Sequence, residues 1–470
     1  MVFSSPVFLF LFLPIFLTFA ALFRGSGKNV VILLFSLLFY SWGEPVYILL
    51  LLASIGINYA SGLAIAASDR PKLLVGLAVA LNLALLVIFK YLGLLTSSLE
   101  AILPIDGISA DIALPLGISF YTFQGISYII DVARDRRLAD KSFINIATYI
   151  SMFPQLVAGP IVRFETVAAQ LRDRVENLSR YRLGLTIFII GLAQKVIFAD
   201  NFAPIADRAF DGTISELSML DAWIGAIAYS LQIFFDFAGY SNMAIGLGAF
   251  LGFTFPKNFN YPYISRSITE FWRRWHMSLS SWFRDYLYIP LGGNRAGPWR
   301  TYFNLVTVFF LCGLWHGASW SFVFWGLLHG AFLVIERVGL GKLLERLPGV
   351  VALAYTLFAV QIAWVFFRAE DFGDAGAYLA AMFGQNADPV SSIYLEVANL
   401  KYLLLTAFGL FCASDRSEFI GRVFGDWREA FNTGQAQVTM TGVFARYSRW
   451  IELGVFLVFL LSIMAIASNA

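Results

Sequence analysis

The sequence is short of charged residues and of cysteine. Charged residues make up 14% of the 470 positions, against roughly 25% in an ordinary soluble domain. The two cysteines, Cys312 and Cys412, have neither the spacing of a metal site nor that of a disulfide framework. The net charge of +2 argues against a nucleic-acid-binding surface. A water-soluble chain with so little charge would have too few polar side chains to cover its surface. We therefore expect the protein to lie in a lipid bilayer.

Apolar residues fill the chain instead, at 59% of all positions, and 47 of them are phenylalanine. A membrane span needs about 20 mostly apolar residues. No long soluble segment separates the apolar stretches, so we predict one all-α, polytopic membrane domain over 1–470 with roughly 11–13 transmembrane or re-entrant helices. The predicted stretches are 6–23, 30–43, 45–67, 73–95, 114–132, 143–160, 183–200, 220–252, 302–317, 319–336, 349–367, 398–414 and 450–468. We interpret the first as a span and not a cleaved signal, because no positive charge precedes it.

The distribution of Lys and Arg among the loops predicts the orientation of the chain. Loops rich in these residues are assigned to the cytoplasm, and loops that carry only acids to the outside. The basic loops are 24–28, 68–72, 132–141 and 337–348, and the acidic ones are 97–112 and 369–397.

One apolar stretch, 143–160, has basic segments on both sides, which breaks the alternation. Pro154, Gly159 and Pro160 interrupt it. We therefore predict a re-entrant loop that enters and returns on one side. Irregular backbone at membrane depth must be buried in protein or line a cavity, so Gln155 in this loop is a candidate substrate-binding residue.

The segment 257–300 is the most polar part of the chain and is also rich in aromatic residues. Such a stretch can lie on the membrane surface against anionic lipids. It can equally line a cytoplasmic cavity that admits an anionic, phosphate-bearing substrate, because the guanidinium fork matches phosphate oxygens. We take 257–320 as the catalytic core segment. The substrate-binding candidates in it are Arg273, Arg274, Arg284 and Asp285.

All three histidines of the chain, His276, His316 and His329, lie in or just after this segment. His316 is 14 residues into an apolar stretch, which places it roughly 20 Å from the cytoplasmic end of a helix. An ionisable side chain at that depth is a functional hypothesis by default, and imidazole is well suited to proton transfer. The alternative is a histidine that joins two helices, an interpretation favoured for His329. Trp315 and Gly317 flank His316, and the glycine leaves room for a substrate.

Further polar residues lie inside apolar stretches. The spacing of Gln124, Ser127 and Asp131 places them on one face of a helix. A second group follows Asp236 and contains three substrate-binding candidates. Packing between helices is the alternative role for each of them. Cys312 shares the face of His316 and could form a nucleophile pair with it, but a buried apolar cysteine is the favoured interpretation. The three candidates are Tyr240, Ser241 and Asn242.

At these residues the sequence resembles the membrane-bound O-acyltransferase family, in particular its bacterial branch that acetylates alginate. The pairing of RRWHMSLS and RDYLYIPLGGN with LWHG is the most specific part of the resemblance. One departure is Asn242, where many relatives have Asp in GYSDMAIG, and Cys312 is not part of the pattern. The other blocks are MVFSSPVFLFLFLP, LPLGISFYTFQGISYIIDV, FPQLVAGPIVRF, FFDFAGYSNMAIGLG, YPYISRSITEF and WVFFRAE.

The resemblance implies a ring of helices around a thin centre, with a cytoplasmic funnel and an outer opening. It matches the family's invariant histidine to His316 and a second one to His276. It also implies acetyl-CoA as the co-substrate, with no metal and no permanently bound cofactor, and periplasmic SGNH-type proteins as partners in the bacterial inner membrane. On this basis His316 is the general base for an acceptor hydroxyl, and His276 orients the donor or stabilises the oxyanion.

Two other functions stay open from the sequence. A sister enzyme that acetylates peptidoglycan or transfers D-alanine to teichoic acid would share the scaffold. A transporter without chemistry would instead predict inverted repeats and paired broken spans, which the sequence does not display.

Overall fold

The computed structural model describes residues 1–103, 112–386, 389–414 and 443–468, and within these ranges every regular element is helical. The first third of the chain forms short and long helices that pack around one apolar core. Their bounds are η1 Phe8–Phe12, α1 Leu13–Leu22, α2 Gly25–Gly43, α3 Ile48–Ala67, α4 Pro71–Leu86, η2 Val87–Tyr91, α5 Leu92–Ile102, α6 Ile118–Arg134, η3 Arg136–Leu138, α7 Phe143–Ser151, α8 Phe153–Leu156 and α9 Phe164–Arg172.

The remaining two thirds build a second apolar core around the histidine-bearing helices. Their bounds are α10 Leu178–Ala193, η4 Gln194–Ala199, α11 Asp200–Asp211, η5 Ile214–Glu216, α12 Met219–Phe250, η6 Pro262–Ile264, α13 Ile268–Arg274, α14 Met277–Phe283, η7 Arg284–Tyr288, α15 Pro298–His316, α16 Trp320–Ile335, η8 Glu336–Leu340, α17 Gly341–Arg346, α18 Gly349–Arg368, α19 Phe372–Met382, α20 Ile393–Val397, α21 Leu400–Cys412 and α24 Val443–Ser468.

Within the described residues, six helices are long and apolar enough to cross a bilayer, so the chain is a multi-pass membrane protein. They are Ile48–Ala67, Pro71–Ile102, Leu178–Asp211, Met219–Phe250, Trp320–Arg346 and Gly349–Arg368. The all-α prediction is confirmed. Several other predicted stretches form helices too short for a full crossing, among them Phe8–Leu22 and Leu400–Cys412.

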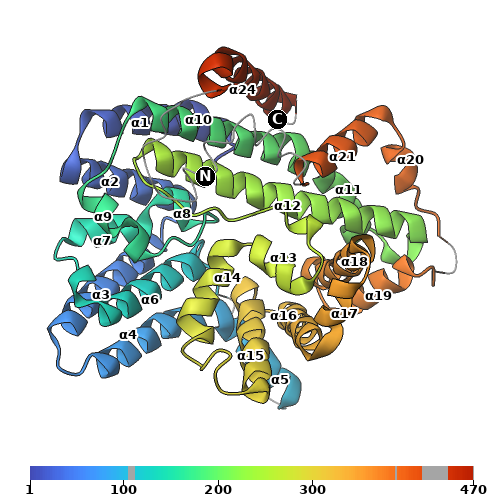
Figure 1. Ribbon diagram of the computed structural model, residues 1–470, viewed down its shortest axis with the longest axis horizontal. Coiled ribbons are helices and arrows are strands. Elements are labelled where there is room, and N and C mark those ends of the chain that lie inside the picture. The colour runs from blue at the N-terminus through green and yellow to red at the C-terminus, as the bar shows by residue number, and fades with distance from the viewer. Residues whose placement is uncertain (104–111, 387–388, 415–442, 469–470) are drawn as a thin grey trace.

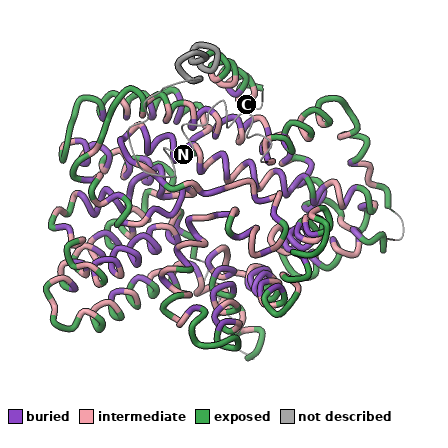
Figure 2. Tube along the Cα trace, in the orientation of Figure 1, coloured by how far each residue is buried: buried purple, intermediate pink, exposed green. Residues whose placement is uncertain are grey.

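Helix α12 runs across the middle of the molecule, with α10, α21 and α24 above it and α4, α6 and α13–α16 below it (Figure 1). Its residues belong to both apolar cores. Buried segments follow the centre and exposed segments the periphery (Figure 2), as expected for a protein whose outer surface meets lipid. The two short helices α13 and α14 lie near the middle of the molecule (Figure 1).

Glycines allow α10 and α12 to approach each other closely. A Cβ on Gly191 would lie 2.5 Å from the carbonyl oxygen of Gly239, and one on Gly246 would lie 2.5 Å from that of Gly184. These distances are far below van der Waals contact, so a side chain at either position would push the helices apart. Small residues at such contacts are the usual basis of helix association in membranes.

Contacts between loops establish which segments share a face of the protein. Lys28 pairs with Glu176 at 2.6 Å, and Arg172 pairs with Asp140 at 3.2 Å. Arg136 donates a hydrogen bond to the Ser68 carbonyl at 2.9 Å. The basic loops 24–28, 68–72 and 132–141 therefore lie together, as their common assignment predicts, and the side of 337–348 stays a prediction. The compartment that this side meets stays a prediction.

The stretch predicted to be re-entrant is a broken helix. Helix α7 ends at Ser151, α8 has only four residues, and extended backbone follows to Arg163. At ~1.5 Å per residue, α7 is about 14 Å long, which is half of a bilayer core. The segment therefore does not cross the bilayer as a single helix. A re-entrant loop requires this interruption.

Candidate active site

Close packing of α15 against α16 creates the frame of the site. Gly326 meets the Phe309 carbonyl and Gly313 meets the Phe322 carbonyl so tightly that neither position has room for a Cβ. The two helices are joined by only three residues, 317–319. This hairpin carries His316 on one helix and His329 on the other.

His316 is the last residue of α15, and its side chain is partly exposed. Its ring meets Trp315, Trp325 and Phe367 edge-on, with ring centroids 4.9, 4.9 and 5.3 Å away. Its Nε2 has no hydrogen-bond partner among the described residues. Helix α15 begins at Pro298, so His316 lies about 27 Å from its start at ~1.5 Å per residue, and not the 20 Å expected from the sequence. It thus lies further along the helix, at the reversal of the chain between α15 and α16.

His276 is completely buried, and its backbone is in the left-handed region with φ 42°. A non-glycine residue in this region costs of order 1 kcal/mol and is frequent at functional sites. Main-chain hydrogen bonds on both sides of His276 hold its backbone conformation. The Met277 amide donates to the Asn258 carbonyl and the Asn260 amide to the Arg274 carbonyl, each at 2.8 Å. The strained residue is therefore held by a paired segment.

Asn258 fixes the tautomer of His276. Its Oδ1 accepts hydrogen bonds from the Ser278 amide at 3.2 Å and the Ser278 hydroxyl at 2.9 Å, which identifies it as the oxygen. The same Oδ1 lies 3.2 Å from Nδ1 of His276. Since an oxygen accepts, Nδ1 carries the proton in the neutral ring. The lone pair of Nε2 is left without a partner among the described residues.

Trp315 lies between the two histidines. The His276 ring is 5.8 Å from the Trp315 ring and the His316 ring 4.9 Å from it, both edge-on. Phe120 and Phe123 pack on the same indole at 5.3 and 5.7 Å. The three site residues His276, Trp315 and His316, selected from the sequence, are thus brought together by the fold.

His329 has a structural environment. It is completely buried, and its Nδ1 accepts a hydrogen bond from the Trp272 indole at 3.2 Å. Trp325 and Phe271 pack on its ring at 5.0 and 6.4 Å. The interpretation that it joins helices is confirmed.

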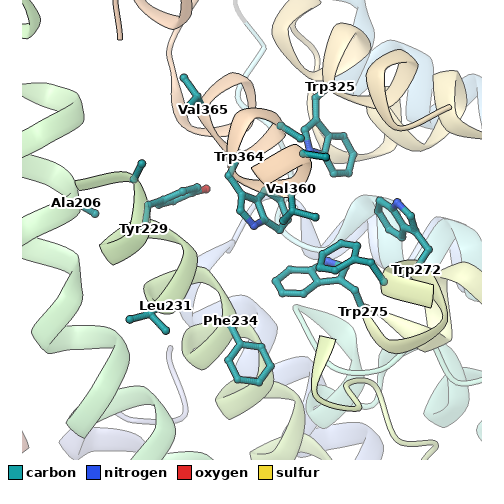
Figure 3. Close-up of a cluster of buried hydrophobic side chains, with 14 of the residues drawn as sticks. Ala206, Tyr229, Leu231, Phe234, Trp272, Trp275, Trp325, Val360, Trp364 and Val365 are labelled. Carbon is teal, nitrogen blue, oxygen red and sulfur yellow. The ribbon is translucent and has the colours of Figure 1, made fainter. Parts of the chain in front are cut away.

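A wall of four tryptophans supports this side of the site. In Figure 3, Trp364 lies beside Trp275 and Trp325, with Trp272 next in the group. Ring centroids are 5.0 Å apart for Trp275 and Trp364, 6.1 Å for Trp325 and Trp364, and 5.8 Å for Trp272 and Trp325. Because Trp325 also touches His316, this tryptophan cluster packs against one side of the His316 ring.

Arg284 and Asp285 belong to an ionic cluster on the face that carries the basic loops. Asp285 pairs with Arg284 at 2.6 Å and with Arg163 at 2.7 Å. Arg134 and Arg163 lie over the Tyr286 ring at 5.0 and 5.4 Å. Burial opposes the charge on Asp285, but the hydrogen bonds from Arg284 and Arg163 hold its pKa below the usual value. Arg163 also lies 3.7 Å from Glu165, and Arg134 lies 3.9 Å from Asp131. Three guanidiniums therefore face three carboxylates, and Arg284 and Arg134 are the most exposed arginines of the cluster.

Arg273 and Arg274 are placed differently from Arg284. Arg273 is exposed, and Arg274 pairs with Glu270 at 2.8 Å and donates to the Asn260 carbonyl at 3.1 Å. Arg274 therefore serves to hold the segment before His276. The cluster around Asp285 gains Arg134 and Arg163, which lie outside 257–320 and were missed because their proximity depends on the fold.

The remaining candidates pack between helices. Tyr240 stacks on Phe3 at 4.4 Å, and Asn242 donates to Gln194 at 2.7 Å. Gln155 is completely buried and donates to the Tyr149 carbonyl. Ser241 is buried, and its hydroxyl has no partner among the described residues. Only their neighbour Phe237 reaches a histidine, at 4.6 Å from His276.

Helix packing is also the role of the other polar residues in the apolar stretches. Asp236 pairs with Lys195 at 2.9 Å, and Asp131 accepts from the Tyr286 hydroxyl at 2.7 Å. Ser127 donates to the Gln124 carbonyl at 2.8 Å. Cys312 is buried and free, as the favoured interpretation has it.

Beside the loop that follows His316 there is an open pocket of about 420 Å³. Ala318, Ser319 and Trp320 line it from the hairpin, and Lys90 and Ser97 from the long helix Pro71–Ile102. Trp320 also donates to Ser98 at 3.2 Å. Ser97 and Ile112 line the pocket, and they are the two ends of the stretch that the loop charges assign to the outside.

Comparison with known proteins agrees with this geometry. Residues 132–341, which include all three histidines, match the membrane-bound O-acyltransferase family. A probable alginate O-acetylase of Azotobacter vinelandii is 43% identical, covering 87% of this chain and 85% of that protein. The corresponding protein of Pseudomonas putida is 44% identical over 87% of each. A peptidoglycan O-acetyltransferase of Helicobacter pylori is 38% identical over 82% of this chain and 80% of that protein.

Proposed function

Since this chain belongs to the membrane-bound O-acyltransferase family, we propose that it takes an acetyl group from cytoplasmic acetyl-CoA and passes it outward through the inner membrane for O-acetylation of an alginate-like polysaccharide. The single observation that carries the proposal is the pair of histidines on either side of Trp315. Both have an unpartnered Nε2 among the described residues. Nε2 of His329 has no partner among the described residues either, so the distinction lies in the shared contact with Trp315, which places two imidazoles in one site.

In the proposed reaction, His316 Nε2 removes the proton of an acceptor hydroxyl. The hydroxyl oxygen attacks the thioester carbonyl, and a tetrahedral oxyanion forms. Its collapse breaks the carbon–sulfur bond, and the leaving thiolate takes the proton from the His316 imidazolium. The products are an O-acetyl ester and free coenzyme A, and the histidine returns to its neutral form.

The tautomer of His276 refines its proposed role. A neutral ring with the proton on Nδ1 offers a lone pair at Nε2, which accepts a hydrogen bond and does not donate one. This supports a role in orienting the donor through one of its N–H groups. Donation to the oxyanion would require a second proton on a ring that is completely buried, and burial opposes that charge.

The donor enters, in this proposal, at the ionic cluster around Asp285. Arg284 is 63% exposed and Arg134 49% exposed, so both can reach phosphates of coenzyme A while Arg163 stays paired. Arg suits this task because its donors match phosphate oxygens. A periplasmic SGNH-type protein is the proposed partner that completes transfer to the polysaccharide.

The test is acetyl transfer by the purified protein in lipid nanodiscs. Radiolabelled acetyl-CoA is supplied with alginate oligosaccharides, peptidoglycan fragments or water as acceptor, with and without a periplasmic SGNH-type protein. Release of coenzyme A that depends on His316, with label on alginate, is the expected result. Label on peptidoglycan alone would move the assignment to the sister function, which the 38% identical relative makes the next candidate. No use of acetyl-CoA would end the proposal.

A further inference from the structure

Lys90 is a cation in an unusual place. It lies in the apolar helix Pro71–Ile102 and is about nine-tenths buried, with a relative exposure of 9%. None of the carboxylates in the described part of the chain forms an ion pair with it. A lysine inside a membrane helix is costly, and such residues usually have a function. Its charge must therefore be stabilised by something other than an acid.

The ammonium of Lys90 instead meets the end of the helix that carries His316. It donates to the main-chain carbonyl of Trp315 and, at 2.9 Å, to the hydroxyl of Ser119. It also lies 5.9 Å from the centre of the Trp315 ring. The carbonyl belongs to the last turn of α15, which ends one residue later. Carbonyls of a last helical turn lack helical amide partners, and a cation there is stabilised by the helix dipole.

A second side chain from the same turn reaches the adjacent carbonyl. The Tyr91 hydroxyl donates to the Leu314 carbonyl at 2.7 Å. Lys90 and Tyr91 are the last two residues of the π-helical turn Val87–Tyr91. Such turns are rare and frequent at functional sites. The turn thus presents two consecutive side chains to two consecutive carbonyls of α15.

From these contacts we propose that Lys90 is a positioning residue that fixes the Trp315–His316 end of α15, so that both histidines keep their orientation toward Trp315. The proposal rests on the proposed acyl transfer. Ala318 and Ser319 line the same pocket as Lys90, so the contact also borders an opening within two residues of His316. A small change in this helix end would move the base relative to the thioester, where a shift of about 1 Å can cost 10²-fold in rate.

The experiment compares Lys90→Met, Lys90→Arg and the control Tyr91→Phe, which removes the neighbouring hydrogen bond without a change in charge. All are purified in nanodiscs. We measure kcat and KM for acetyl-CoA, the melting temperature, and the rate at which diethyl pyrocarbonate modifies each histidine, followed by mass spectrometry. His276 and His329, both completely buried, are internal references for the reactivity of His316.

For Lys90→Met we expect kcat to fall by about 10- to 100-fold with KM nearly unchanged, together with an altered modification rate at His316 alone. Lys90→Arg should recover part of kcat, because guanidinium donates to the same carbonyl. Tyr91→Phe should have the smaller effect. If Lys90→Met is not inserted, Ser119→Ala removes the other partner of the ammonium and should alter the reactivity of His316 in the same direction, more weakly.

The inference is overturned if folded Lys90→Met keeps the wild-type kcat and the wild-type reactivity of His316. It is also overturned if kcat falls only in proportion to the folded fraction, since that indicates a purely structural role. The histidine-modification assay needs no acetyl transfer. It therefore separates a failure of this inference from a failure of the proposed function, in which the wild-type protein itself would not use acetyl-CoA.

Discussion

His316 and His329 belong to the same helical hairpin and touch the same tryptophan, yet their surroundings differ. Trp325 is 4.9 Å from the ring of His316 and 5.0 Å from that of His329. His329 is completely buried and bonded to Trp272. His316 is partly exposed, and its Nε2 has no partner in the part of the chain that the structure describes. Nε2 of His329 has no partner among the described residues either, so the two histidines differ in exposure and in their neighbours. His316 is partly exposed and contacts Trp315, whereas His329 is enclosed and linked to Trp272.

The strongest test of this contrast is His316→Ala. We expect the acetyl-transfer rate to fall by about 10²- to 10⁴-fold, the usual contribution of a general base. Stability should hardly change, because the side chain is partly exposed and makes no hydrogen bond through Nε2. Transfer kinetics and thermal melting in nanodiscs measure the two effects. A folded variant with wild-type transfer would remove His316 from the mechanism.

His276→Asn addresses the second catalytic candidate. Asparagine tolerates the left-handed backbone better than other side chains, so this change spares the fold at φ 42°. Loss of the Nε2 lone pair should reduce kcat by about 10- to 100-fold, as expected for a misplaced donor. Single-turnover kinetics with labelled acetyl-CoA check this. An unchanged rate would show that the fixed tautomer has no use in catalysis.

Arg284→Gln tests the donor entrance at the ionic cluster around Asp285. We expect KM for acetyl-CoA to rise by about three- to tenfold, because an exposed charged hydrogen bond is lost, with little change in kcat. Acetyl-pantetheine lacks the phosphates and should not distinguish the variant from the wild type. The matched control is Arg273→Gln, at an exposed arginine outside the cluster. Equal effects of both variants would contradict a defined phosphate site.

The smallest effect on transfer is expected for His329→Phe. Phenylalanine keeps a ring in the aromatic packing but leaves the Trp272 indole without its acceptor. An unsatisfied buried donor costs about 1–3 kcal/mol, so the melting temperature should fall while kcat stays within about twofold. If this variant lost transfer as completely as His316→Ala, the assignment of a structural role to His329 would be wrong.

The sequence was sufficient for the helical class, the common face of the basic loops and the trio His276, Trp315 and His316. Hydrophobic stretches and a few ionisable residues report these features directly. The partners of the trio depend on contacts between distant segments. Asn258 carries no sign that its oxygen would fix a tautomer, and Arg163 joins Asp285 from a different part of the chain. Lys90 did carry a signal, as a charge within the apolar stretch 73–95, and it was overlooked.

Polar residues inside apolar stretches differ in whether their polar atoms find partners. Tyr240 and Asn242 were counted as substrate-binding candidates, but the structure gives them Phe3 and Gln194 as neighbours. In lipid, a polar side chain finds a partner on a facing helix whether or not it has a chemical role. Sequence position alone cannot separate the two cases. Asn242 is bonded to Gln194, whereas the hydroxyls of Tyr240 and Ser241 have no partner among the described residues, so these two remain candidates.

The position of α12 has a consequence for how material crosses the membrane. Carriers that alternate between two openings rotate one half of the protein against the other. Here a single helix is embedded in both apolar cores, and its glycines sit against α10 without spare room, so the halves are locked together. We therefore expect the coenzyme to stay on its own side throughout the cycle, and only the two-carbon unit to change compartments.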